Sequence, residues 1–225
     1  MNVRQPLRST RRTRRGFSLA EMLIAFAISA ALMTAMLVAL DTIFKGYETN
    51  ADSASSHVIS RIATNRILGM IRTGTDFGPM PADVLDVNKN PMFADYFEFV
   101  SARDENGVPT QLSRIEFRYA GQGAQYRAWG AGEDEPDMDF TPTATGELWM
   151  VQIDPADDSE TPFLLLREVR SALFSLVYDV GPRLERCTID IVVEPDIPES
   201  VKLDSGARPE TIRIVASAMP RRIVN

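Results

Sequence analysis

The sequence is short of the residues that form disulfides, zinc sites and histidine-dependent active sites. Among its 225 residues it has one cysteine, Cys187, and one histidine, His57. One cysteine cannot form an intrachain disulfide, and there are no paired CxxC motifs for zinc. A Ser-His-Asp triad or a histidine metal cluster would have to be built around His57, which we interpret instead as a solvated or interfacial helix residue. We interpret Cys187 as a packed small residue, and we predict that the protein is not an enzyme.

Acidic residues are absent from the first 16 positions, and proline is absent from residues 17–73. The first 16 residues contain six arginines, so their removal would change the net charge from −7 to −13. A remainder this acidic lacks the basic patch by which proteins bind nucleic acid, and no nucleic-acid partner is expected. The missing prolines allow residues 17–73 to form one helix without a proline kink.

An apolar run of 19 residues, 22–40, is interrupted only by Ser29 and Thr34. As a helix, residues 17–40 would extend ~36 Å, enough to cross a hydrocarbon core ~30 Å thick. The arginines before this segment place the N-terminus in the cytoplasm and everything after Leu40 across the membrane. The segment is also rich in small residues, which let helices approach closely in lipid. These are Ala20, Ala25, Ala27, Ala30, Ala31, Ala35 and Ala39.

One carboxylate, that of Glu21, stands inside this hydrophobic segment, four residues after Phe17. An acid at the centre of a bilayer costs ~2.5–3.5 kcal/mol or more, so its presence indicates a functional role. Residues four apart lie on the same face of a helix, which places Phe17 and Glu21 together.

Residues 16–21, Gly-Phe-Ser-Leu-Ala-Glu, stand between the arginine-rich leader and the apolar run. This arrangement resembles the class III signal of type IV pilins and type II secretion pseudopilins. The resemblance implies that a prepilin peptidase cuts between Gly16 and Phe17, and that the new N-terminal Phe17 is N-methylated. It also implies that the amine of Phe17 pairs with Glu21, in the same chain or in an adjacent one. This pair would set the register as a subunit docks into a filament.

Two other interpretations of this segment are a twin-arginine export signal and a plain signal anchor or cleaved secretory signal. An ordinary secretory signal has an apolar core of ~7–15 residues and an A-x-A-like exit. The core in this chain is longer, and no such exit follows it. Glu21 argues against the twin-arginine signal, and a plain anchor would not need it.

We predict four segments: a cleaved leader (1–16), a transmembrane helix (17–40), the periplasmic half of the same helix (41–73) and a globular periplasmic domain (74–225). Gly74 is the predicted helix stop. Apolar residues continue at helical spacing beyond the membrane, and this face is expected to form the spine of the domain. The face comprises Ile43, Phe44, Tyr47, Ala51, Ala54, Val58 and Ile62, extended by Ile67, Leu68 and Ile71.

The remainder of the chain predicts short antiparallel strands, and therefore an α+β, pilin-like fold with a long N-terminal helix packed on a C-terminal sheet. Residues 74–93 are predicted as a linker. Residues 125–129 are expected to pair back across the turn at 121–123, and 147–153 with 163–167 to form a hairpin. The predicted strands are 96–100, 113–119, 125–129, 147–153, 163–167, 173–179, 188–194 and 211–217.

The C-terminal third resembles J-type minor pseudopilins and PilW-type minor pilins. The matching segments are 163–167, 177–179, 187–193 and 212–221. Many type IV pilins close a C-terminal loop with a disulfide, which this chain cannot form, and this favours a pseudopilin or minor pilin over a major adhesive pilin.

The resemblance implies a minor pseudopilin of a type II secretion system, which assembles into or primes a periplasmic pseudopilus from the inner membrane. Its implied partners are other pilin or pseudopilin subunits, bound through the N-terminal helix, the prepilin peptidase and the inner-membrane assembly platform. The alternatives are a minor type IV pilin, acting in pilus assembly, twitching or DNA uptake, and a membrane-anchored binding domain that does not assemble.

An acidic run at residues 133–139 contains the only metal-site candidates that we identify. Asp134, Asp137 and Asp139 could supply oxygen ligands to calcium. The spacing lacks an EF-hand pattern, and charge runs in loops are usually solvated. The main expectation is therefore a protein without a cofactor.

Overall fold

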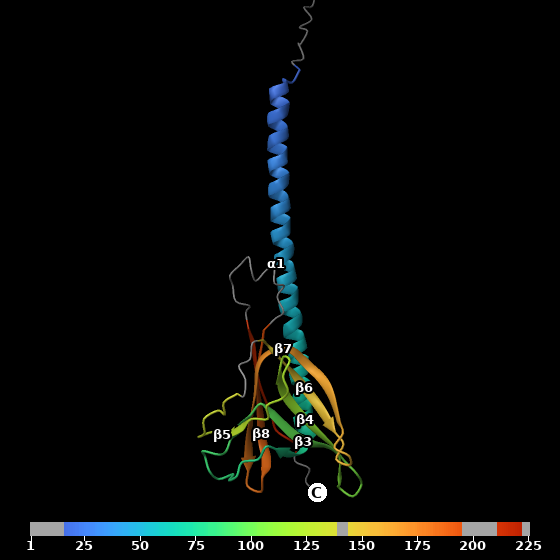
Figure 1. The fold of residues 1–225 in the computed structure, drawn as a ribbon, viewed down its shortest axis with the longest axis vertical. Helices are drawn as coiled ribbons and strands as arrows, with labels where there is room; N and C mark the ends of the chain where they lie inside the picture. Colours follow the sequence, from blue (N-terminus) through green and yellow to red (C-terminus); the bar gives the residue numbers. More distant parts are fainter. Residues whose placement is uncertain (1–15, 139–143, 195–210, 222–225) are drawn as a thin grey trace, which may run out of the picture. The chain divides into compact units, whose positions relative to one another are not determined.

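The computed structural model describes residues 16–138, 144–194 and 211–221 (Figure 1). Its first element is one long helix, α1 (Leu19–Thr73), which ends directly before Gly74, the predicted stop. The helix begins two residues later than the predicted start at Phe17. The chain divides into two compact units, residues 1–48 and 49–225, so α1 contributes to both.

Nine strands follow α1 in the described part of the chain, and every pair of neighbouring strands is antiparallel (Figure 1). This confirms the predicted α+β class. The sheet has the order β1-β3-β4-β6-β7-β2-β5, and β8 joins β7 to β9. The strands are β1 (Thr75–Gly78), β2 (Met92–Ala94), β3 (Tyr96–Arg103), β4 (Pro109–Tyr119), β5 (Ala128–Gly130), β6 (Gly146–Ile153), β7 (Glu160–Asp179), β8 (Arg183–Val193) and β9 (Ile212–Ala218).

The strand β7 serves as the central member of the sheet. Its 20 residues include the two segments predicted as separate strands, 163–167 and 173–179, so that prediction is wrong about their number. β7 pairs with β6 as far as Val169, with β2 from Phe174, and with β8 along its other edge. Glu168 has a positive φ of 55°, and the β7–β8 register shifts between Val169 and Ser171. Such a bulge bends a strand and increases its twist, which allows one strand to have successive partners.

Two further predictions about the strands need correction. The predicted linker 74–93 contains β1 and most of β2. Residues 125–129 do not pair back on the preceding strand, where the structure has only an isolated bridge between Arg118 and Ala124. Instead β5 pairs with β2, far away in the sequence. Strands of three or four residues carry little signal of their own and depend on the partners that tertiary folding brings to them.

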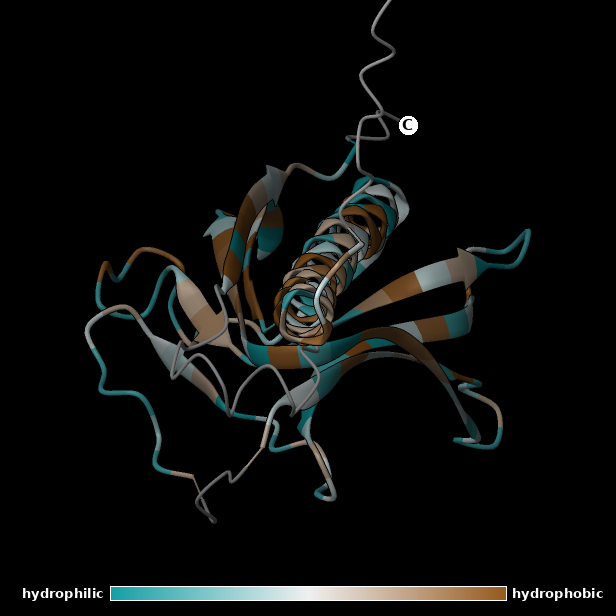
Figure 2. Cartoon of the chain, turned by 90° about the horizontal axis from the view of Figure 1, so that it is seen from above, coloured by the Kyte–Doolittle hydropathy of each residue, from teal (hydrophilic) through white to brown (hydrophobic). Residues whose placement is uncertain are grey.

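The face of α1 that packs on the sheet agrees with the predicted one only in its last part, at Ile67, Leu68 and Ile71. The buried helix residues are Ser60, Ala63, Thr64, Ile67 and Ile71. By contrast, Val58 is 57% exposed and Ile62 is 63% exposed. The sheet curves around the last turns of the helix (Figure 2).

Small side chains explain this choice of face, because they let the helix backbone approach the sheet closely. The hydroxyls of Ser60 and Thr64 do not stay unpaired when buried. They donate to the carbonyls of Ser56 (2.6 Å) and Ser60 (2.8 Å) within the helix. The helix residues contact a core built from both long and short strands, which includes Phe97, Ile115, Leu148, Phe174, Cys187, Ile189 and Ile191.

Candidate functional site at the N-terminus of α1

The predicted cleavage site lies in an open segment just before α1. Phe17 is 85% exposed, and a Cβ placed on Gly16 would meet no atom within 4 Å. The conformation of this chain therefore does not require glycine at position 16. A requirement for glycine there would have to come from a protein that binds the segment, such as a peptidase whose cleft leaves no room for a side chain.

Glu21 forms a capping box with Ser18 at the start of α1. The backbone N–H of Ser18 donates to Glu21 Oε2 at 2.8 Å, and the backbone N–H of Glu21 donates to Ser18 Oγ at 3.2 Å. Two of the unpaired donors at a helix start are satisfied in this way. The sequence predicted a role for Glu21 toward Phe17 and did not include Ser18, although the S-x-x-E spacing is a recognisable signal. Before cleavage, the carboxylate of Glu21 thus has a partner in its own chain.

The part of α1 that follows, residues 22–40, is apolar on all sides and exposed. In the described part of the chain it is one helix that is long and apolar enough to cross a membrane. The hydroxyl of Thr34 donates to the carbonyl of Ala30 at 2.9 Å, so this polar group is satisfied inside the helix. Internal satisfaction of polar groups is what a lipid environment requires, because lipid offers no partner.

A family model, the prokaryotic N-terminal methylation motif, matches residues 11–37. No match is found among curated proteins or solved structures. The chain therefore carries a prepilin-type signal of the kind found in type IV pilins and pseudopilins. Together the motif and the apolar helix fit a membrane-anchored, single-pass protein, and they point to a structural subunit.

Replacing Gly16 with leucine is expected to block cleavage of the leader. The fold tolerates a side chain at this position, so the effect would arise in recognition by the peptidase. Intact mass spectrometry of the membrane-extracted protein should show a wild-type chain that starts at Phe17, with one added methyl group, and an uncut Gly16→Leu chain. Ser18→Ala serves as the control and should be processed. A wild-type N-terminus other than Phe17 would overturn the assignment.

The calcium candidates are only partly described. Asp134 and Asp137 are exposed, and Asp139 lies outside the described residues. Their neighbours already have partners: Glu135 accepts from Arg127 Nη1 at 2.9 Å, and Glu133 accepts from the Gly130 N–H at 2.9 Å. Within the described residues there is no cluster of three or more His, Cys, Asp or Glu side chains suited to a metal. The structure tests neither the expectation of a protein without a cofactor nor the calcium alternative.

The single cysteine and the single histidine of the chain occupy different environments. Cys187 is fully buried in the core, and burial raises the pKa of its thiol to about 12. Its interpretation as a packed small residue is confirmed, because a protonated, buried thiol is unreactive. His57 is exposed on α1.

The outer face of the sheet contains a buried charge network that was not predicted from the sequence. Glu116 on β4 is 0% exposed and accepts hydrogen bonds from Arg114 Nε (2.6 Å), Tyr126 Oη (2.9 Å) and Arg118. Arg114 also donates to Glu160 at 2.7 Å. Burial and the bond to Glu116 raise the pKa of Tyr126 to about 12, so its hydroxyl stays a donor.

The pattern of residues along β4 was a misleading signal for this network. The alternation of Arg114, Glu116 and Arg118 along β4 is typical of a strand with one solvated face. In the structure the guanidinium of Arg114 lies 4.6 Å from the ring centroid of Tyr126, and that of Arg118 lies 5.1 Å from Trp149. These aromatic rings and the arginine stems cover the carboxylate of Glu116. Tyr126 lies in a loop, and its approach to β4 is decided by tertiary folding.

Proposed function

We propose that this chain is a minor pseudopilin of a type II secretion system. In this proposal residues 1–16 are removed, residues 17–40 hold the subunit in the inner membrane, and residues 41–225 lie in the periplasm. The subunit joins or primes a pseudopilus through α1. A J-type or PilW-type subunit is the favoured assignment within the class, because the chain has one cysteine and three consecutive antiparallel strands, β7, β8 and β9, in its C-terminal third.

The observation that carries the proposal is the apolar surface left uncovered along α1. Beyond the membrane-spanning residues, Ala51, Ala54, Val58 and Ile62 are exposed on the helix face that does not pack on the sheet. Burying a valine or isoleucine side chain fully contributes ~1.5–3 kcal/mol, so a partner helix on this face would be stabilised strongly. Single exposed apolar residues are common, but a row at helical spacing indicates an interface.

Cross-linking along this row tests the proposal. A benzophenone-maleimide attached to Ile62→Cys is expected to form adducts with other pilin-like subunits in illuminated cells. Buried Cys187 does not compete for the reagent, because its thiol is inaccessible and protonated. The matched control is His57→Cys, which is also exposed on α1 but lies ~140° around the helix from Ile62. Equal adducts from both positions, or none from Ile62→Cys, would contradict assembly through this face.

A deletion strain separates secretion from the alternative of a minor type IV pilin. Loss of the chain is expected to trap secreted proteins in the periplasm while surface pili and twitching persist. The opposite pattern would favour the minor pilin. If neither process changed and Ile62→Cys gave no adducts, the anchored binding domain would be the better interpretation.

A further inference from the structure

The last part of α1 has charges of one sign only. Between residues 53 and 73 the helix has three arginines, Arg61, Arg66 and Arg72, and no acidic residue, although the whole chain has a net charge of −7. All three are exposed, and no ion pair or hydrogen bond joins their side chains to another described residue. A fourth exposed arginine, Arg221, lies at the same end, where its backbone N–H donates to the carbonyl of Arg72 at 3.0 Å. The end of α1 is therefore a basic surface on an acidic protein.

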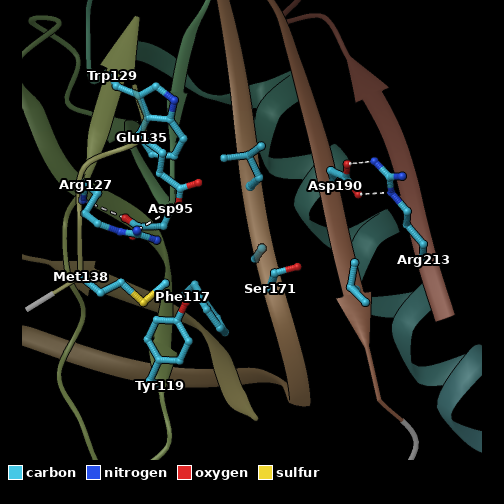
Figure 3. Close-up of a pocket in the computed structure, with 13 residues that line it drawn as sticks. Asp95, Phe117, Tyr119, Arg127, Trp129, Glu135, Met138, Ser171, Asp190 and Arg213 are labelled. Atoms are coloured by element: carbon cyan, nitrogen blue, oxygen red, sulfur yellow. Dashed lines mark hydrogen bonds and ion pairs between the residues drawn. The ribbon is translucent and has the colours of Figure 1, made fainter. Parts of the chain in front are cut away.

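Arginines of the sheet, in contrast, include several that pair with carboxylates. Figure 3 shows two of these pairs: Arg127 binds Asp95 at 2.8 Å, and Arg213 binds Asp190 at 2.5 Å. These acids are thus occupied by their own partners within the sheet.

The acids that are nearest to the α1 arginines in the sequence do not neutralise them either. Asp52 lies nine residues before Arg61, which is ~14 Å along the helix axis. On the other side, Asp76 forms an ion pair with Arg103 of β3. The positive charge of this helix face is therefore available to a partner.

Arg61 and Arg66 border the exposed apolar row of α1 on both sides. At ~100° per residue, Arg61 lies ~60° to one side of Val58, and Arg66 lies ~40° to the other side of Ile62. The apolar stems of arginines can extend beside such a row while the guanidinium groups stay in water. A helix that packs on Val58 and Ile62 would therefore come within reach of both charges.

Charge complementarity decides which helix suits this face. Basic residues beside the apolar row of a partner would be repelled, whereas acidic residues on both of its sides would be attracted. A second copy of this chain does not meet this condition with its own α1. The acids that follow its membrane-spanning residues are Asp41, Glu48 and Asp52, and by helical spacing they lie within ~40° of one another, on one side only.

We propose that the partner on this face is a helix of a different subunit, which has acidic residues on both sides of its apolar row. Its carboxylates pair with Arg61 and Arg66 while its apolar side chains contact Val58 and Ile62. This pairing rests on the proposed assembly through α1 and adds the chemistry of the partner. The apolar contacts supply affinity, and the charges select the partner and fix its register.

Carbodiimide coupling of the variant Arg66→Lys tests for an acidic partner directly. The reagent joins an amine to a carboxylate in contact with it: an amide forms, and the displaced oxygen leaves in the urea made from the reagent. In membranes of cells that contain the full chain, the new amine is expected to couple to an Asp or Glu of another subunit. Trypsin cleaves after Arg61 and Arg72 but not at a coupled lysine, so mass spectrometry should find the link in peptide 62–72. The control Arg186→Lys, exposed on β8, should give no link to another subunit.

Charge reversal gives a second measurement, on the benzophenone adducts of Ile62→Cys. Adding Arg66→Glu should lower their yield about tenfold, because like charges then face each other. Adding Arg186→Glu changes the net charge equally and should leave the yield unchanged.

The outcomes separate the acidic partner from the assembly itself. If Ile62→Cys alone gave no adducts, assembly through this face would be contradicted, and the acidic partner with it. If adducts formed but Arg66→Glu left their yield unchanged, or Arg66→Lys gave no link, the acidic partner alone would be wrong. A link to a carboxylate of this same sequence would also overturn it, including the acids of residues 195–210, which lie outside the described residues. If Arg66→Glu failed to fold, the coupling of Arg66→Lys, which keeps the charge, would still decide.

Discussion

Replacing Glu116 with alanine is expected to lower the free energy of unfolding by about 3 kcal/mol, near the lower end of the range for breaking a buried ion pair. Glu116 is fully buried and forms ion pairs with two arginines at once, Arg114 and Arg118. Without it, the guanidinium groups of Arg114 and Arg118 lose the carboxylate that they share, and the hydroxyl of Tyr126 loses its acceptor. The expected loss is not larger because Arg114 keeps its contacts with Glu160 and Glu98.

Glu160→Ala provides the matched control for this prediction. Glu160 binds the same arginine at a similar distance (2.7 Å against 2.6 Å), but its side chain is 46% exposed. An exposed ion pair contributes at most ~1 kcal/mol, so this variant should be close to the wild type in stability. Urea unfolding of the full chain in micelles, followed by near-UV circular dichroism, measures both changes. Equal losses for the two variants would show that burial of Glu116 does not govern the network.

Replacing Glu21 with glutamine is expected to leave the protein in the membrane and to reduce its incorporation into filaments by about tenfold or more. The glutamine keeps an oxygen that can accept the Ser18 N–H, but it loses the charge that would bind the amine of a processed Phe17. A charge-assisted hydrogen bond contributes ~1.5–3 kcal/mol, which is enough for a change of this size. Removing an acid from the apolar span also favours membrane insertion, so export should not suffer.

The variant Ser18→Ala separates the helix cap from the charge. It removes the hydroxyl that caps the Glu21 N–H but leaves the backbone N–H that binds the carboxylate. Loss of the cap costs ~0.5–2 kcal/mol of helix stability at the first turn, and assembly should be retained. The measurement is the share of each variant that co-sediments with sheared filaments, after mass spectrometry has confirmed processing. If Ser18→Ala assembled poorly and Glu21→Gln assembled normally, the cap would matter and the proposed charge pairing would be wrong.

Residues 16–40 could be interpreted from the sequence because their signal is local. One short segment contains the arginine-rich leader, Gly16, the acid at Glu21 and the apolar run. Each of these features can be interpreted from its own residues, without knowledge of the rest of the fold. The family model matches within the same region, over residues 11–37. The end of α1 before Gly74 could be predicted for the same reason, because a helix is built from contacts between residues a few positions apart.

Features that depend on distant contacts could not be predicted in this way. Helical spacing predicted one apolar face along α1 that included Val58, Ile62 and Ile67, but only packing against the sheet decided that Ile67 would be buried and that the other two would be exposed. The sequence alone does not show how closely a helix approaches a sheet. In this structure the approach is close, and small residues of α1 fit between the helix and the sheet.

The outer face of the sheet and the partners of β7 were likewise decided by tertiary structure. β7 continues past the described end of β6 before it meets β2, so one strand has successive partners along the same edge. Glu116 is buried only because the Tyr126 loop and two arginines fold over it. By itself the sequence determined that this chain carries a prepilin-type signal on an apolar helix, through interactions between near neighbours. Tertiary structure decided which surfaces of the protein remain available to partners, because exposure depends on all the segments that meet at one place.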